Sequence, residues 1–92
     1  MKNLIIIGRR WFNDTQGNTY HTVEMCIDEN TVKLPIRYGY GNQYLYTAIG
    51  YLKEEKLIET DGIVAWQILE ELSGKGVYVK TFVFDVPRKK DL

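Results

Sequence analysis

The feature that most constrains the fold of this 92-residue chain is a change in the spacing of its apolar residues around Gly41. Before Gly41, apolar and polar residues alternate over residues 19–28 and 32–38, which is the two-residue period of a β-strand. After Gly41, apolar residues recur at i, i+3, i+4 and i+7 over residues 45–52, which is the period of an amphipathic helix. The chain therefore begins with strands and then changes to helix.

The remaining segments extend this pattern to a complete α+β fold. An apolar first strand is expected near residues 3–12, a second helix near 65–72 with Gly74 after it, and a last strand near 77–86. The expected order is βββααβ: an antiparallel sheet of about four strands, with two helices on one face and the last strand returning beside the first. Residues 1–92 form one domain, with 88–92 expected as a frayed tail.

Two residues refine these boundaries. Pro35 cannot donate a hydrogen bond to a neighbouring strand, so the third strand is expected to lie at an edge or to carry a bulge there. Asn42 precedes the first helix and is a suitable N-cap.

The composition disfavours several classes of function. Twelve basic and twelve acidic residues cancel, which disfavours both a strongly basic domain that coats phosphate and an acidic nucleic-acid mimic. The single cysteine, Cys26, cannot form an intramolecular disulfide, and one histidine and one cysteine cannot make an ordinary zinc site. The apolar run at residues 4–7 is too short for a membrane span or a signal core. We expect a cytoplasmic protein without a membrane partner, a metal or a cofactor.

The stretch Arg37–Ala48, RYGYGNQYLYTA, contains four of the seven tyrosines. Glycines before a helix let backbone N–H groups approach an anion, and Arg37 lies just upstream. The stretch lacks the lysine of a phosphate-binding loop and the third glycine of a dinucleotide fingerprint, so a tight strand-to-helix turn is the favoured interpretation. The candidate ligand-binding or partner-binding residues in this stretch are Arg37, Tyr38, Tyr40, Gly41, Asn42 and Tyr46.

The stretch GRRWF is a second candidate. Because side chains alternate along a strand, Arg9 and Trp11 share one face, and Arg10 and Phe12 share the other. An arginine beside a tryptophan can stack on it and hold a base or a partner side chain. The alternative is an arginine stem that covers an aromatic ring at the edge of the sheet.

His21 is the only histidine. Alternation places it at the margin of the core, where it is expected as a hydrogen-bonding structural residue first and a binding residue second. Catalysis by His21 would need a carboxylate partner that spacing does not supply. No catalytic residues are assigned.

Four stretches resemble a known group of proteins. GRRWF, GNTYHTV, YGYGNQY and DVPRKKDL, in this order and near this spacing, resemble small proteins encoded by bacteriophages and prophage-like elements. The resemblance spans nearly the whole chain. It implies an accessory protein that acts in the cytoplasm of a bacterial host, and it implies no activity.

Three functions follow as hypotheses. The first is a non-enzymatic module that binds a host or phage protein, including a counter-defence role, through an aromatic-rich surface. The alternative is nucleic-acid or nucleotide binding, with arginines on phosphate and aromatic rings on bases. An enzyme dependent on His21 ranks third. The sequence also allows a two-fold homodimer through the uncovered face of the sheet.

Overall fold

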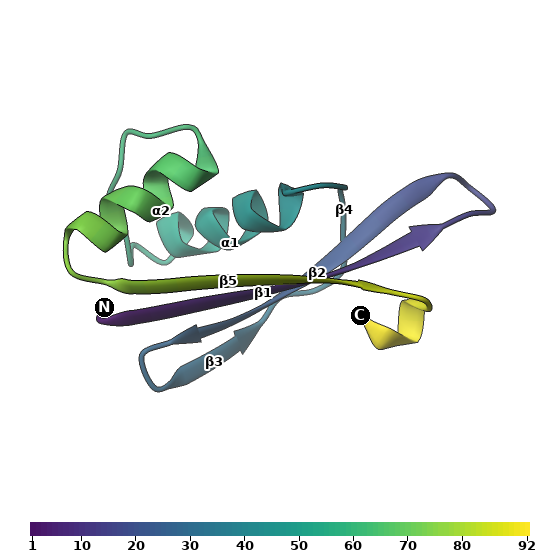
Figure 1. Cartoon of the computed structure of the whole chain (residues 1–92), viewed down its shortest axis with the longest axis horizontal. Helices are drawn as coiled ribbons and strands as arrows, with labels where there is room; N and C mark the ends of the chain where they lie inside the picture. The colour runs from purple at the N-terminus through teal and green to yellow at the C-terminus, as the bar shows by residue number, and fades with distance from the viewer.

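The centre of the sheet is an antiparallel hairpin of β1 (Asn3–Asn13) and β2 (Asn18–Ile27), as Figure 1 shows for the computed structural model, which describes all 92 residues. Alternation along both strands separates two faces. One face carries the buried apolar side chains of the core, and the other carries mostly half-buried and exposed ones. The turn between the strands uses Gly17 at φ 72°, a left-handed conformation that suits glycine.

Pro35 divides the third predicted strand into two. β3 (Asn30–Lys33) and β4 (Arg37–Tyr38) both pair antiparallel with β2, and Pro35 lies between them. The prediction of an edge strand disturbed at Pro35 is therefore confirmed. This edge of the sheet is short and interrupted.

The last strand, β5 (Tyr78–Val86), lies beside β1, but it runs parallel to β1. The α+β class and the number of main strands are confirmed, whereas the expectation of a wholly antiparallel sheet needs correction: the sheet is mixed, in the order β3-β2-β1-β5, with β4 also on β2. The reason is the path of the helices. They return the chain to the end where β1 starts, and there the Tyr78 N–H donates to the Lys2 carbonyl over 2.8 Å.

Both helices cover one face of the sheet (Figure 1). α1 (Gln43–Glu54) lies over β1 and β2, and α2 (Ala65–Gly74) lies against β5. They close one hydrophobic core, whose buried residues are Leu4, Ile6, Val23, Met25, Ile27, Tyr44, Ala48, Ile49, Leu52, Ala65, Ile68, Leu69, Leu72 and Val77.

The helix ends differ in detail from the sequence prediction. Asn42 occupies the N-cap position of α1, but its side chain makes no capping hydrogen bond. At the end of α2, Gly76 rather than Gly74 takes the left-handed conformation, with φ 93°. The Gly76 and Val77 N–H groups donate to the Ser73 and Leu72 carbonyls, which is the Schellman pattern.

The C-terminal residues expected as a frayed tail form a 3₁₀ turn, η1 (Lys89–Asp91). An ion pair joins Arg88 to Asp91 at 3.3 Å, and the Lys33 ammonium donates to the Leu92 carbonyl over 3.4 Å. Figure 1 shows this turn on the side of the sheet opposite the helices. None of the helices combines the length and the apolar character needed to span a membrane.

Candidate binding surface

The ten residues singled out in the sequence lie on two different sides of the sheet. The first group lies on the helix side, where Arg10, His21 and Gly41 take part in one polar network around the turn between β4 and α1. The second group lies on the face that the helices leave open; its members are Arg9, Trp11 and Tyr38. The candidate residues therefore do not form a single site.

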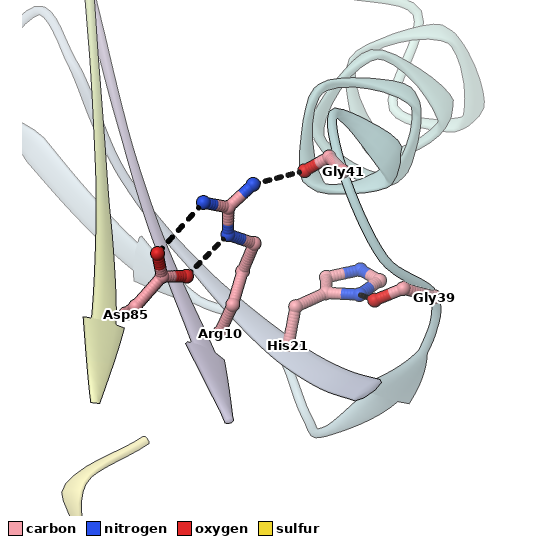
Figure 2. A network of polar contacts seen from close by, with 5 residues as sticks. All are labelled: Arg10, His21, Gly39, Gly41 and Asp85. Carbon is pink, nitrogen blue, oxygen red and sulfur yellow. Dashed lines mark hydrogen bonds and ion pairs between the residues drawn. The ribbon is translucent and has the colours of Figure 1, made fainter. Parts of the chain in front are cut away.

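Arg10 joins three elements, as Figure 2 shows. Its guanidinium donates from Nε and Nη2 to the Asp85 carboxylate of β5, over 2.7 and 3.0 Å, and from Nη1 to the Gly41 carbonyl over 2.9 Å. This fork-to-fork geometry gives an arginine–carboxylate pair directional strength. Arg10 therefore fixes β1, β5 and the start of α1, and its charge is already neutralised within the chain.

His21 lies beside Arg10 in the same network and is fully buried. Its Nδ1 is 3.2 Å from the Gly39 carbonyl, and its Nε2 is 2.8 Å from the Thr47 hydroxyl. Because a carbonyl can only accept, Nδ1 carries the proton, and in the neutral ring Nε2 accepts from Thr47. No carboxylate is a hydrogen-bond partner of His21.

Burial lowers the pKa of His21 below its ordinary value of 6.5. The hydrogen bond to the Gly39 carbonyl opposes this change in pKa, and the positive charge of Arg37 adds to it. The folded protein therefore favours the neutral imidazole. These contacts agree with the structural role predicted for His21.

The remaining helix-side residues are dispersed. Tyr40 is exposed beside Arg10 in a shallow hollow, and Arg37 and Tyr46 line another hollow near the middle of α1. The Tyr46 hydroxyl accepts a hydrogen bond from the Ala65 N–H over 3.3 Å, which ties α1 to the start of α2. These tyrosines do not converge on one ligand-sized site.

The open face of the sheet carries most of the exposed aromatic surface. We call its six aromatic residues the aromatic face: Trp11, Tyr20, Tyr38, Tyr78, Phe82 and Phe84. Three of them form a row across β1, β2 and β4, in which Trp11 stacks on Tyr20 with ring centroids 6.0 Å apart, and Tyr20 meets Tyr38 edge-on at 5.7 Å. Such aromatic pairs add stability beyond the area they bury.

The other three aromatic residues lie on β5 and remain largely in solvent. Tyr78, Phe82 and Phe84 are 56%, 43% and 52% exposed, and Tyr38 is 63% exposed. Together these four side chains present on the order of 400 Å² to solvent, if a ring residue offers about 200 Å². These rings are spread over the open face, because Tyr38 lies level with Trp11 whereas Tyr78 lies beside Asn3 at the other end of the sheet. Exposed aromatic side chains of this kind are common at protein interfaces.

The open face carries one ion pair and two further lysines, Lys33 of β3 and Lys80 of β5. Arg9 pairs with Glu24 at 3.0 Å, and each of the two side chains is about one third exposed. At one end, Lys89 of η1 faces Trp11 and Tyr20 across a hollow of about 370 Å³. The C-terminal turn thus borders the aromatic face.

Sequence reasoning missed the contribution of β5. Tyr78, Phe82 and Phe84 occupy even positions, so simple alternation along the last strand would have placed all three on one face. It also missed Asp85 as the partner of Arg10, and no local signal links residues 75 positions apart.

No protein-family model, curated protein or solved structure matches this chain. The structure contains no group of three or more histidine, cysteine, aspartate or glutamate side chains placed to hold a metal ion.

Proposed function

We propose that this protein is a non-enzymatic module that binds another protein through its aromatic face. The observation that carries the proposal is the exposure of Tyr38, Tyr78, Phe82 and Phe84 on the side of the sheet that no helix covers. Tyrosine, tryptophan and phenylalanine are enriched in the cores of protein interfaces because they bury large areas and have few rotatable bonds.

The charges favour a protein over a nucleic acid as the partner. Arg9 and Arg10, which the alternative function would assign to phosphate, each already pair with a carboxylate at 3.0 Å or less. A nucleic acid would have to compete with Glu24 and Asp85 for them. Pairing within the chain leaves Arg9 and Arg10 with less free positive charge for phosphate, which favours a protein partner.

The resemblance to phage and prophage proteins suggests the partner's origin. We propose a host or phage protein in the bacterial cytoplasm, with inhibition of a host defence as one such role. The hydrogen-bonding of His21 to a carbonyl and a hydroxyl supports a binding protein rather than an enzyme.

A paired comparison of surface variants tests the proposal. The double variant Tyr38→Ser/Phe84→Ser removes two exposed rings of the aromatic face, and Ile63→Ser/Trp66→Ser removes exposed apolar side chains at the helices, which are 83% and 57% exposed. Immobilised wild-type protein and the helix-side variant should capture the same protein from an extract of phage-infected bacteria. The aromatic-face variant should capture at least tenfold less of that protein.

Two outcomes would contradict the proposal. Equal loss of capture in both variants would show that apolar surface in general, and not the aromatic face, retains the partner. Gel-shift binding to single-stranded nucleic acid that weakens steeply with salt, and that disappears in Tyr38→Ser/Phe84→Ser, would establish the alternative function.

A further inference from the structure

The two edges of the sheet are very unlike. One edge consists of the four-residue β3 and the two-residue β4, separated at Pro35, and such interruption protects an edge from unwanted pairing. The other edge is β5, with nine residues and only β1 as a neighbour. A long edge without proline, interior glycine or bulge is a template for another strand.

The backbone groups that β5 leaves free can be identified. The Tyr78 N–H points to the β1 side, where it donates to the Lys2 carbonyl. The pairing with β1 is unbroken from Tyr78 to Val86, so the direction of the backbone groups alternates strictly along the strand. The N–H and C=O groups of four residues therefore point away from the sheet: Val79, Thr81, Val83 and Asp85.

These four residues are arranged symmetrically about Phe82. In an antiparallel pair of two β5 strands centred on Phe82, Val79 of one copy faces Asp85 of the other, and Thr81 faces Val83. Each of these is a hydrogen-bonded pair, in which two residues exchange both N–H···O bonds. Every outward N–H of one copy then finds an outward carbonyl of the second copy.

The side chains are compatible with the same register. On the aromatic face, Phe82 meets Phe82 of the second copy at the two-fold axis, and Lys80 faces the ring of Phe84, a favourable neighbour for an ammonium group. Centring the pair on Lys80 would set two like charges opposite each other, and centring it on Phe84 would place Pro87, which has no N–H, opposite Thr81.

We propose that β5 pairs antiparallel with β5 of a second copy across a two-fold axis at Phe82, which joins two sheets into one and makes the two aromatic faces continuous. The match of Phe82 with Phe82 and of Lys80 with Phe84 in this register argues for a second copy over a foreign strand. Since Tyr78, Phe82 and Phe84 together expose only about 300 Å² per copy, the interface lies in the small, weakly associating class. The dimer should dissociate on dilution.

Cysteine cross-linking tests the register, in a background where Cys26 is replaced by serine. A residue on the axis, in a non-hydrogen-bonded pair, has its counterpart about 4.5 Å away between Cα atoms, within the range of a disulfide. Phe82→Cys should therefore oxidise to a covalent dimer. Lys80→Cys is the matched control, because its counterpart is about 13 Å away, four residues along the strand at ~3.3 Å each, and it should remain uncross-linked.

A proline on the free edge tests the pairing itself. Thr81→Pro removes an outward N–H without removing a bond to β1, a position at which a strand tolerates proline. Sedimentation should show a concentration-dependent dimer for the wild type and a monomer for Thr81→Pro with an unchanged circular dichroism spectrum. In the cross-linking background, Thr81→Pro should abolish the disulfide of Phe82→Cys.

Three results would overturn the proposal. The first is a wild-type monomer at every concentration up to the millimolar range. The second is equal cross-linking of Phe82→Cys and Lys80→Cys, which would indicate packing face to face. The third is a dimer that persists in folded Thr81→Pro. If Thr81→Pro fails to fold, the two cysteine variants alone decide. None of these results depends on the partner proposed for the aromatic face.

Discussion

Gly39 and His21 show how single residues shape the turn that leads into α1. Gly39 is buried and has φ 151°, and a Cβ atom there would lie 2.4 Å from the Gln43 side chain and 3.2 Å from the His21 ring. Gly41 has φ 61° with open space around it. The two glycines of this turn are thus required for different reasons.

The first prediction compares these glycines. Gly39→Ala should lower the free energy of unfolding by about 3 kcal/mol, because strain in the backbone adds to collision with two neighbours. Gly41→Ala should lower it by about 1–2 kcal/mol, from the backbone alone. Urea denaturation of both variants measures the difference. Equal losses would show that the contacts of Gly39 with Gln43 and His21 contribute nothing.

The second prediction concerns the pH dependence of stability. The folded-state pKa of His21 is lowered from 6.5, chiefly by burial, so the unfolded chain binds the proton more tightly. The stability that depends on neutral His21 should therefore be fully present above pH 6.5. The free energy of unfolding should fall as the pH drops from 6.5 toward the folded-state pKa of His21. Urea denaturation of the wild type and His21→Gln over this range should show the slope only in the wild type.

Asp28 provides a control in a separate pH range. Its carboxylate accepts hydrogen bonds from the Lys2 and Asn3 N–H groups, over 2.7 and 3.0 Å, and these bonds lower its pKa from 3.8. Stability that depends on Asp28 is present above pH 3.8 and is lost as the pH falls through the folded-state pKa. Asp28→Asn should change the pH dependence of the free energy of unfolding only in this acidic range. If Asp28→Asn also removed the pH dependence near pH 6, the assignment of that dependence to His21 would be wrong.

At the scale of elements, the two helices end in the same motif with different residues. α2 ends through Gly76, whereas α1 ends through Lys56, which takes φ 58°. The Lys56 and Leu57 N–H groups donate to the Lys53 and Leu52 carbonyls, the same Schellman pattern. A side chain in the left-handed region strains the backbone, so α1 ends less favourably than α2.

The third prediction follows from this difference. Lys56→Gly should raise the free energy of unfolding by about 1 kcal/mol, because glycine adopts the left-handed conformation without strain. Lys53→Gly, within the last turn of α1, should lower it by about 1 kcal/mol. Thermal or urea denaturation should therefore give changes of opposite sign for the same substitution three residues apart. A decrease in both variants would contradict the strain at Lys56.

At the scale of the whole molecule, Arg10 connects parts of the chain that are remote in sequence. Its guanidinium bridges the Asp85 carboxylate and the Gly41 carbonyl, so it joins the parallel strand pair to the turn before α1 (Figure 2). Asp85 is 74% exposed at its side chain, which limits the strength of the ion pair through solvent screening.

The fourth prediction is a double-mutant cycle on this pair. Arg10→Ala and Asp85→Ala should show a coupling free energy of about 1 kcal/mol in urea denaturation. Arg10→Ala should be the more destabilising single change, because it also leaves the Gly41 carbonyl without its donor. Arg10→Lys should lower the free energy of unfolding less than Arg10→Ala does. It should still be destabilising, since an ammonium group cannot form the bidentate contact with Asp85. Additive single losses would show that the pair does not couple.

The sequence by itself determined the elements and their order. Alternation gave the strands, the helical period gave α1 and α2, and Pro35 marked the interrupted edge, because each of these signals depends on neighbours within a few residues. It also supported the hydrogen-bonding role of His21, which the contacts with Gly39 and Thr47 agree with.

Only the tertiary structure decided how distant segments meet. The direction of β5 depends on where two helices return the chain, and the pairing of Arg10 with Asp85 depends on that direction. The same is true of the site: Arg10 of GRRWF contacts Gly41 of the glycine-rich stretch on the helix side, while Trp11 lies on the open face with Tyr20 and Tyr38. Local sequence patterns fix which side of a strand a residue occupies, but the neighbouring strand is set by packing across the whole chain.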